Sequence, residues 1–396
     1  MNFDMIGKLT LSKETDNFKP YQELLYDSGW KRKRLVFNVI SGDNRHSLTI
    51  NAGAFADGHG DVYSFTKGSV DSNGNKIKGE LIKIPFKDRL TSPKLSEIAE
   101  FKKFVLDLEE VGRRRLIESA IEKVKEGNIT DEDLEKIHIS SVDDLEFELT
   151  KSKSLRKEFI SEWDFIDAIK ETISSGKYAN RKFLIYGNGE YSYNENNNQV
   201  YESLIPTRIY LASNDSEEYS KCDIKFLYGK DAIDESFLEE KNKYYVNGWI
   251  MEYENNRKSN IPVPITFSIP LQDNDKKTNA LKKKFIVDEE DKIYEYGIVC
   301  SMLNGAQKTK ITMDMLDDEV KDDIECGLIT FEEVVKELGG NVYGDRVKEW
   351  QFLEIGRGYK SKGREITAYT SDNMIITQLE SEDVTAGLFD EDEDDI

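Results

Sequence analysis

Residues 29–40 read GWKRKRLVFNVI, and they are followed by the turn residues SGDN at 41–44 and by RHSLTI at 45–50. Valine, isoleucine and phenylalanine favour a pleated surface, so residues 35–40 predict a strand. The turn residues and the polar–apolar alternation at 45–50 predict the return strand of a hairpin. Four consecutive cations behind Trp30 lead into this hairpin, around which we expect the rest of the chain to be organised.

Cations and aromatic rings on an antiparallel sheet suit a single nucleic-acid strand. The cations hold phosphates, and the rings stack on bases of any identity. A run of four cations is as often a solvated strand end, because short charge runs are usually surface. Both interpretations of residues 31–34 stay open at this stage.

The amino-acid composition predicts a soluble protein. A length of 396 residues is enough for two or three domains. No apolar run of about 18 residues predicts a membrane span, and residues 1–4 lack a secretory pattern. Cys222, Cys300 and Cys326 are odd in number and far apart in sequence, which predicts buried free thiols in a reducing compartment.

The formal net charge of −22 argues against a broadly basic groove for duplex DNA. Residues 382–396 hold eight acids and no base. Any phosphate binding must therefore come from local cationic patches.

The order of predicted elements favours a mainly β chain with helical segments (α+β). Short strands and turns over residues 1–92 predict a five-stranded barrel of the OB type. Helical spacing of residues such as Phe101, Val105 and Leu108 predicts a helical connector over 93–178. A second OB-like β domain with a helical insertion is expected over 179–380, where Asn188-Gly189 reads as a hairpin turn. Residues 381–396 read as a disordered acidic tail.

Catalytic chemistry has little support in the sequence. The histidines are not spaced with cysteines as metal ligands, and no Walker loop or nucleophile elbow occurs. The acidic pairs Asp317-Asp318 and Asp322-Asp323 could hold Mg²⁺ in a nuclease, but acids are also stabilised at the helix start predicted there. We therefore expect a binding protein that is not an enzyme and has no cofactor or metal.

Aromatic residues are numerous, and some lie beside cations or turns on predicted strands. Each of these side chains is as likely to pack in the core as to stack on a base. A stacked base would contribute roughly 1 to 3 kcal/mol to binding. The group consists of Tyr186, Tyr191, Tyr193, Tyr210, Tyr244 and Trp249.

The C-terminus places apolar residues on both sides of a run of acids. Such a tail either keeps the protein soluble or docks into a basic groove with an apolar end, and we favour docking. The candidate partner-binding residues are Leu388, Phe389, Asp394, Asp395 and Ile396.

Several segments together resemble the single-stranded DNA-binding replication proteins of bacteriophages. They are spread over about 350 residues and include no catalytic motif; they comprise residues 7–9, 28–30, 35–46, 84–86, 99–104, 244–248 and 340–346. The resemblance implies OB-type barrels, coating of single strands, and the cytoplasm of an infected bacterial cell. The tail is similar to that of bacterial single-stranded DNA-binding proteins, which recruit replication and repair enzymes. Ile396 stands where those proteins end in Pro-Phe, so the partners could differ.

We therefore expect a protein of DNA replication and recombination that coats single-stranded DNA without sequence preference and recruits partners through its tail. The rival hypotheses are a phage virion or assembly protein and a metal-dependent nuclease. The candidate DNA contacts are Trp30, Arg32, Arg34, Arg45, Tyr63, Arg208, Tyr210, Arg357, Lys360 and Arg364.

Overall fold

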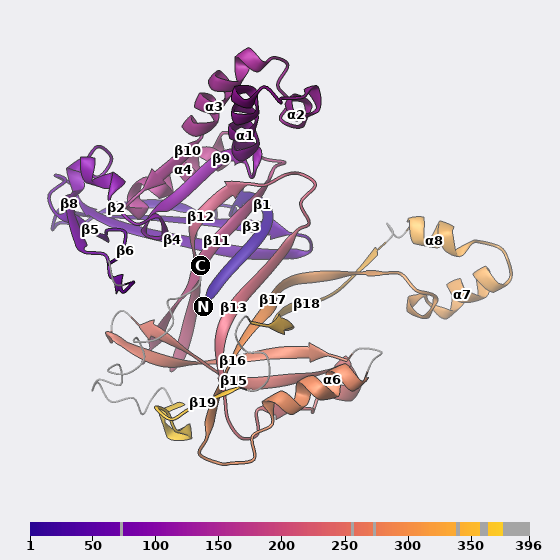
Figure 1. Cartoon of the computed structure of the whole chain (residues 1–396). Coiled ribbons are helices and arrows are strands. Elements are labelled where there is room, and N and C mark those ends of the chain that lie inside the picture. The colour runs from indigo at the N-terminus through magenta and orange to yellow at the C-terminus, as the bar shows by residue number, and fades with distance from the viewer. Residues whose placement is uncertain (72–73, 255–256, 272–274, 338–340, 357–362, 375–396) are drawn as a thin grey trace.

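The computed structural model describes residues 1–71, 74–254, 257–271, 275–337, 341–356 and 363–374. Within these residues, fifteen strands join one large mixed sheet, and β5–β8 and β6–β7 form two small sheets. The prediction of a mainly β chain with helical segments is confirmed (Figure 1).

Five strands of the N-terminal half pair in a closed sequence, which we call ring 1. β1 pairs with β3, β3 with β4, β4 in parallel with β12, β12 with β11, and β11 again with β1. Their bounds are β1 Asn2–Leu11, β3 Trp30–Ser41, β4 Asn44–Phe55, β11 Lys182–Asn194 and β12 Gln199–Leu211. Alternate residues of β1 and β3 point inward, including Met5, Leu35 and Phe37, which are fully buried.

Five later strands pair in the same order, which we call ring 2. β13 pairs with β15, β15 with β16, β16 in parallel with β18, β18 with β17, and β17 again with β13. Their bounds are β13 Tyr219–Tyr228, β15 Lys243–Glu254, β16 Ser259–Pro270, β17 Ile293–Lys310 and β18 Asn341–Ile355.

A short helical segment supplies a buried phenylalanine to each ring. In ring 1, α4 (Glu162–Ser174) places Phe165 5.3 Å from the ring of Phe104. In ring 2, η5 (Lys283–Phe285), which follows α6 (Asp275–Lys282), places Phe285 5.3 Å from the ring of Tyr228. Both phenylalanines belong to one hydrophobic cluster that runs through the two rings.

The two rings are not separate sheets, because β1 pairs with strands of both. Residues 2–6 of β1 pair with β13, and residues 8–11 pair with β3. The change of partner occurs at Gly7, where a Cβ would lie 2.3 Å from the carbonyl oxygen of Ile40. Only glycine allows the two backbones to approach this closely.

The predicted boundary between residues 178 and 179 is wrong as a division between β domains. β11 and β12 follow that boundary, yet they complete ring 1 by pairing with β1 and β4. The predicted connector is therefore an insertion within ring 1. It is also not wholly helical, since β9 (Phe104–Glu110) and β10 (Arg156–Phe159) pair with each other and β9 pairs with β12.

Two helical groups extend from the rings (Figure 1). α1 (Arg113–Glu126), α2 (Asp131–Lys136) and α3 (Leu145–Ser154) share a small core around Ile117 and Leu145. α7 (Asp318–Glu325) and α8 (Phe331–Glu337) lie between β17 and β18 and pack around Leu316 and Val334. No helix in the described part of the chain has the length and apolar character needed to cross a bilayer.

The remaining elements are short. The strands are β2 Tyr21–Leu25, β5 Asp61–Phe65, β6 Ser69–Val70, β7 Lys76–Ile77, β8 Leu81–Pro85, β14 Ile233–Asp234 and β19 Arg364–Ile366. The helices are η1 Phe86–Asp88, η2 Pro93–Ser96, η3 Glu100–Lys102, η4 Val142–Asp144, α5 Leu238–Lys241, η6 Met313–Met315 and η7 Ser371–Met374.

Two of the three cysteines meet in ring 2. Cys222 of β13 lies directly opposite Cys300 of β17, and both are free thiols in the core. Burial, together with the neighbouring thiol, raises the pKa of Cys222. The prediction of buried free thiols holds for this pair but is wrong for Cys326, which is exposed.

Candidate nucleic-acid interface

The run of cations predicted from the sequence lies inside β3, and strand alternation divides it between two faces. Trp30, Arg32 and Arg34 point to the outer side of the β3–β4 hairpin. Their partners across the ladder are Phe55, Gly53 and Asn51. We call this surface, formed by Trp30, Arg32, Arg34, Asn51 and Phe55, the hairpin face.

Lys33 points the other way and does not belong to the hairpin face. Its side chain is only 3% exposed, and its Nζ donates to Asp167 Oδ2 at 2.7 Å. The same ammonium lies 4.0 Å from the centre of the Trp163 ring. Lys33 therefore anchors α4 to the sheet.

The indole of Trp30 lies flat across the neighbouring strand. A Cβ at Gly53 would be only 2.1 Å from Trp30 Cζ2, so the absence of a side chain there lets the ring rest on β4. Trp30 meets Phe55 edge-on at 4.9 Å, and Phe55 stacks on His59 at 3.8 Å. We call Trp30, Phe55 and His59 the corner cluster; Trp30 is 37% exposed and His59 is exposed.

Charge on the hairpin face favours an anionic ligand. This face carries the guanidiniums of Arg32 and Arg34 and no acid, whereas the whole chain has a net charge of −22. Arg32 is exposed, and its guanidinium donates to Asn51 Oδ1 at 3.3 Å. An exposed ring beside two guanidiniums can hold a base and the phosphates next to it.

Sequence reasoning missed Phe55 and His59. The signal was present, because a two-residue turn at Gly42 and Asp43 sets the register of the whole hairpin. Counting back along both strands from that turn pairs Trp30 with Phe55.

Four predicted contacts lie elsewhere on the large sheet. Arg45 is exposed near the hairpin turn, where its carbonyl accepts a hydrogen bond from Asn304 Nδ2 at 2.8 Å. Arg208 and Tyr210 are half-buried on β12, with Tyr210 6.1 Å from the ring of Tyr186. Arg364 on β19 forms an ion pair with Glu295, with 3.4 Å between Nη2 and Oε1. Among the described residues of the predicted set, Trp30, Arg32 and Arg34 share the hairpin face, and Arg208 and Tyr210 share a face of β12.

Tyr63 lies on the small β5–β8 sheet and is exposed. Arg357 and Lys360 lie outside the described residues, as do the predicted partner-binding residues Leu388, Phe389, Asp394, Asp395 and Ile396.

Three other aromatic candidates pack in the hydrophobic core. Tyr191 and Tyr244 are buried, and the Tyr191 hydroxyl donates to Glu202 at 3.1 Å. Trp249 packs against the cluster of Ile366, Tyr369 and Met374. Tyr193 is half-buried beneath the guanidinium of Arg257, which is 4.9 Å from its ring.

No family model matches the chain, and no curated protein sequence does. Among solved structures, the chain is similar to a deletion mutant of the single-stranded DNA-binding protein from Thermus aquaticus. Sequence identity is 6% and the TM-score is 0.26, over 76% of this chain and 86% of that chain. At that TM-score the likeness carries no argument.

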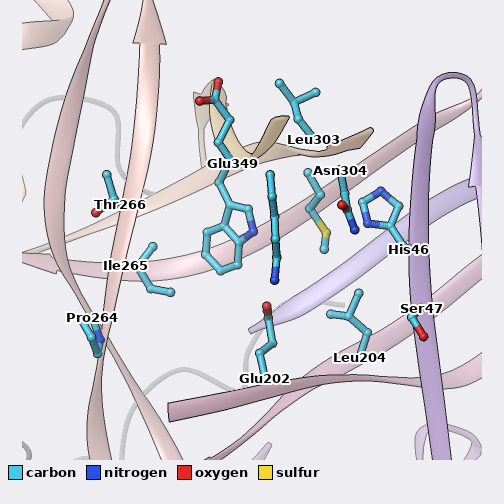
Figure 2. A pocket seen from close by; sticks show the side chains of 13 residues that line it. His46, Ser47, Glu202, Leu204, Pro264, Ile265, Thr266, Leu303, Asn304 and Glu349 are labelled. Carbon is cyan, nitrogen blue, oxygen red and sulfur yellow. The ribbon is translucent and has the colours of Figure 1, made fainter. Parts of the chain in front are cut away.

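A cavity of about 390 Å³ separates the two rings (Figure 2). Its lining includes His46 of β4, Glu202 of β12, Asn304 of β17 and Glu349 of β18. His46 Nε2 lies 2.9 Å from Ser220 Oγ, and the Ser220 hydroxyl donates to the carbonyl of Met302 at 3.0 Å. Burial lowers the pKa of His46 to about 4. The cavity wall therefore carries a neutral imidazole that joins the two rings.

The residues that the structure describes contain no group of three or more His, Cys, Asp or Glu side chains placed to hold a metal ion. Asp317 and Asp318, one of the two acidic pairs considered for Mg²⁺, stand at the start of α7, with Asp317 at its N-cap position.

Proposed function

We propose that this chain binds single-stranded DNA without sequence preference, along the hairpin face, and that it has no catalytic activity. The observation that carries the proposal is the outer side of β3–β4, where Arg32 and Arg34 lie on the same face as Trp30 of the corner cluster. Arg32 and Arg34 would hold successive phosphates, while Trp30 and Phe55 would stack on bases.

The strand order of the rings supports this assignment. We propose that both rings are OB-type barrels, in which the face of the second and third strands is the usual site for oligonucleotides. In ring 1 the second and third strands are β3 and β4. The hairpin face therefore coincides with the surface that this barrel type uses.

A role in phage replication and recombination is the finer part of the proposal, and the resemblance described above supports it. The acidic tail would recruit partner proteins in the cytoplasm of the host. Deleting residues 387–396 is expected to leave the affinity for oligo-dT unchanged or higher and to abolish partner recruitment. Affinity measured by anisotropy checks this prediction, and weaker strand binding after the deletion would contradict the role given to the tail.

The hairpin face is tested by the double substitution Arg32→Ala with Arg34→Ala. We expect affinity for labelled oligo-dT at low salt to fall at least about tenfold. The slope of log affinity against log salt should become shallower by about 1.4, since each neutralised phosphate on a single strand contributes about 0.7. Fluorescence anisotropy over a range of salt concentrations measures both quantities.

The matched control is Lys151→Ala with Lys153→Ala on α3, which removes the same charge from the helical insertion. This control should bind like the wild type. An equal loss in the control and in the arginine variant would show that net charge, and not the hairpin face, determines affinity. An unchanged slope in the arginine variant would refute the proposed site.

A further inference from the structure

The small β5–β8 sheet exposes one apolar face. Tyr63 and Phe65 alternate along β5 and lie opposite Lys83 and Leu81 of β8. Tyr63 is 59% exposed, Phe65 44% and Leu81 59%. The opposite side of this sheet is covered, because Ile82 and Ile84 are buried in a cluster with Ile98 and Ile160.

A neighbouring segment adds a third ring to this face. The amide of Ala99 donates to the carbonyl of Phe65 at 3.0 Å, which holds residues 99–102 beside the end of β5. Phe101 is 64% exposed. Lys102 Nζ lies 5.6 Å from the centre of the Phe65 ring and 5.2 Å from that of Phe101.

Cations and rings therefore alternate on this surface. Lys83 Nζ lies 5.9 Å from the centre of the Tyr63 ring and also contacts Asp61 at 3.0 Å. We call Tyr63, Phe65, Lys83, Phe101 and Lys102 the mini-sheet face. Exposed aromatic side chains gathered on one face are uncommon in a protein that has no ligand there, because burial of each ring would be favourable.

The β5–β8 sheet begins next to the corner cluster. β4 ends at Phe55, His59 stacks on that ring, and β5 begins at Asp61. The amide of Phe86, directly after β8, donates to the carbonyl of Gly60 at 3.0 Å and fixes this corner. Figure 1 shows β5 and β8 beside β2 and β4, at the side of the molecule away from α7 and α8.

The segment of the chain that contains both faces is basic. Residues 30–103 hold fourteen lysines and arginines and eight aspartates and glutamates, a net charge of +6 within a chain of −22. A local excess of positive charge in an otherwise acidic chain favours a polyanionic ligand over a protein partner at this surface.

We propose that a bound single strand passes over the corner cluster from the hairpin face onto the mini-sheet face. There Tyr63, Phe65 and Phe101 stack on bases, and Lys83 and Lys102 lie along the phosphates. Alternate residues of a strand are about 6.6 Å apart, roughly twice the rise per nucleotide of a stacked strand. Tyr63 and Phe65 therefore take up separate, unstacked bases. This inference rests on the proposed function and extends its site.

The test compares short and long oligo-dT with the variant Tyr63→Ala/Phe65→Ala. An oligomer of about 6 nucleotides fits the hairpin face alone, whereas one of about 20 nucleotides reaches both faces. We expect the variant to bind the short oligomer like the wild type. Its affinity for the long oligomer should fall roughly 5- to 150-fold for each stacked base that is lost.

Two further variants keep the result interpretable. Tyr63→Phe/Phe65→Tyr retains both rings and should restore binding of the long oligomer. Phe147→Ala removes an exposed ring from α3 and should change neither affinity. Circular dichroism of each variant reports whether the chain is folded.

Unchanged affinity for the long oligomer overturns the inference while the proposed function stands, provided that the wild type binds both oligomers. A variant that alters self-association in sedimentation, with no effect on strand affinity, also overturns it and marks the face as a protein contact. If the wild type binds neither oligomer, the proposed function and this inference both fail.

Discussion

Replacing Phe285 with alanine is expected to lower the free energy of unfolding by about 3 to 5 kcal/mol, the usual cost of removing a buried aromatic ring. Phe285 is fully buried in ring 2, with ring centres 5.3 Å away at Tyr228, 5.5 Å at Phe267 and 5.7 Å at Tyr296. The strands around it are hydrogen-bonded to one another and cannot collapse into the space. Urea denaturation followed by circular dichroism measures the change.

The matched variant is Phe285→Leu, which keeps most of the apolar volume and should cost less. Affinity for oligo-dT should remain close to that of the wild type in both variants wherever the protein is folded, because the hairpin face belongs to ring 1. A stability loss below about 1 kcal/mol in Phe285→Ala would show that the Phe285 side chain does not fill the interior of ring 2.

The second large effect concerns pH and His46. Its pKa is lowered by burial from 6.5 to about 4, so the unfolded chain binds a proton more tightly than the folded one between these values. Stability from this group is complete above pH 6.5 and is lost as the pH falls towards 4. The loss amounts to about 3 kcal/mol.

The control for this prediction is His46→Gln, which offers an amide donor to Ser220 but does not titrate. Other groups titrate in the same interval, so the quantity to compare is the difference between the two stability profiles from pH 7 to pH 4. The wild type should lose more stability than the variant as the pH falls. Parallel profiles would show that the imidazole is protonated as easily in the folded protein as in the unfolded chain.

Local sequence patterns predicted the hairpin well. The turn predicted at residues 41–44 and the β-prone run before it specify both strands; β3 and β4 extend one residue further into the turn and five residues beyond the predicted segments at their far ends. Alternation also predicts which cations share a face, although the sequence does not say which face is outside. Lys33 is buried because Asp167 and Trp163 cover it, and Asp167 is 134 residues away in the chain.

The errors arise where distant residues override local preference. Phe101, Val105 and Leu108 fit helical spacing, yet residues 104–110 form β9 because β10 and β12 offer backbone partners on both sides. Asn188-Gly189 reads as a turn but lies within β11. Its neighbour Gly187 is needed there because a Cβ would lie 2.4 Å from the ring of Phe3, a contact that no local pattern contains.

The double pairing of β1 has a consequence for how the protein is made on the ribosome. β1 ends at residue 11, but its partners β11 and β13 begin only at residues 182 and 219. Closing so long a loop is slow, and the unpaired edge of the nascent chain can associate with other chains meanwhile. Efficient production therefore depends on shielding of that edge until β11 and β13 have been synthesised.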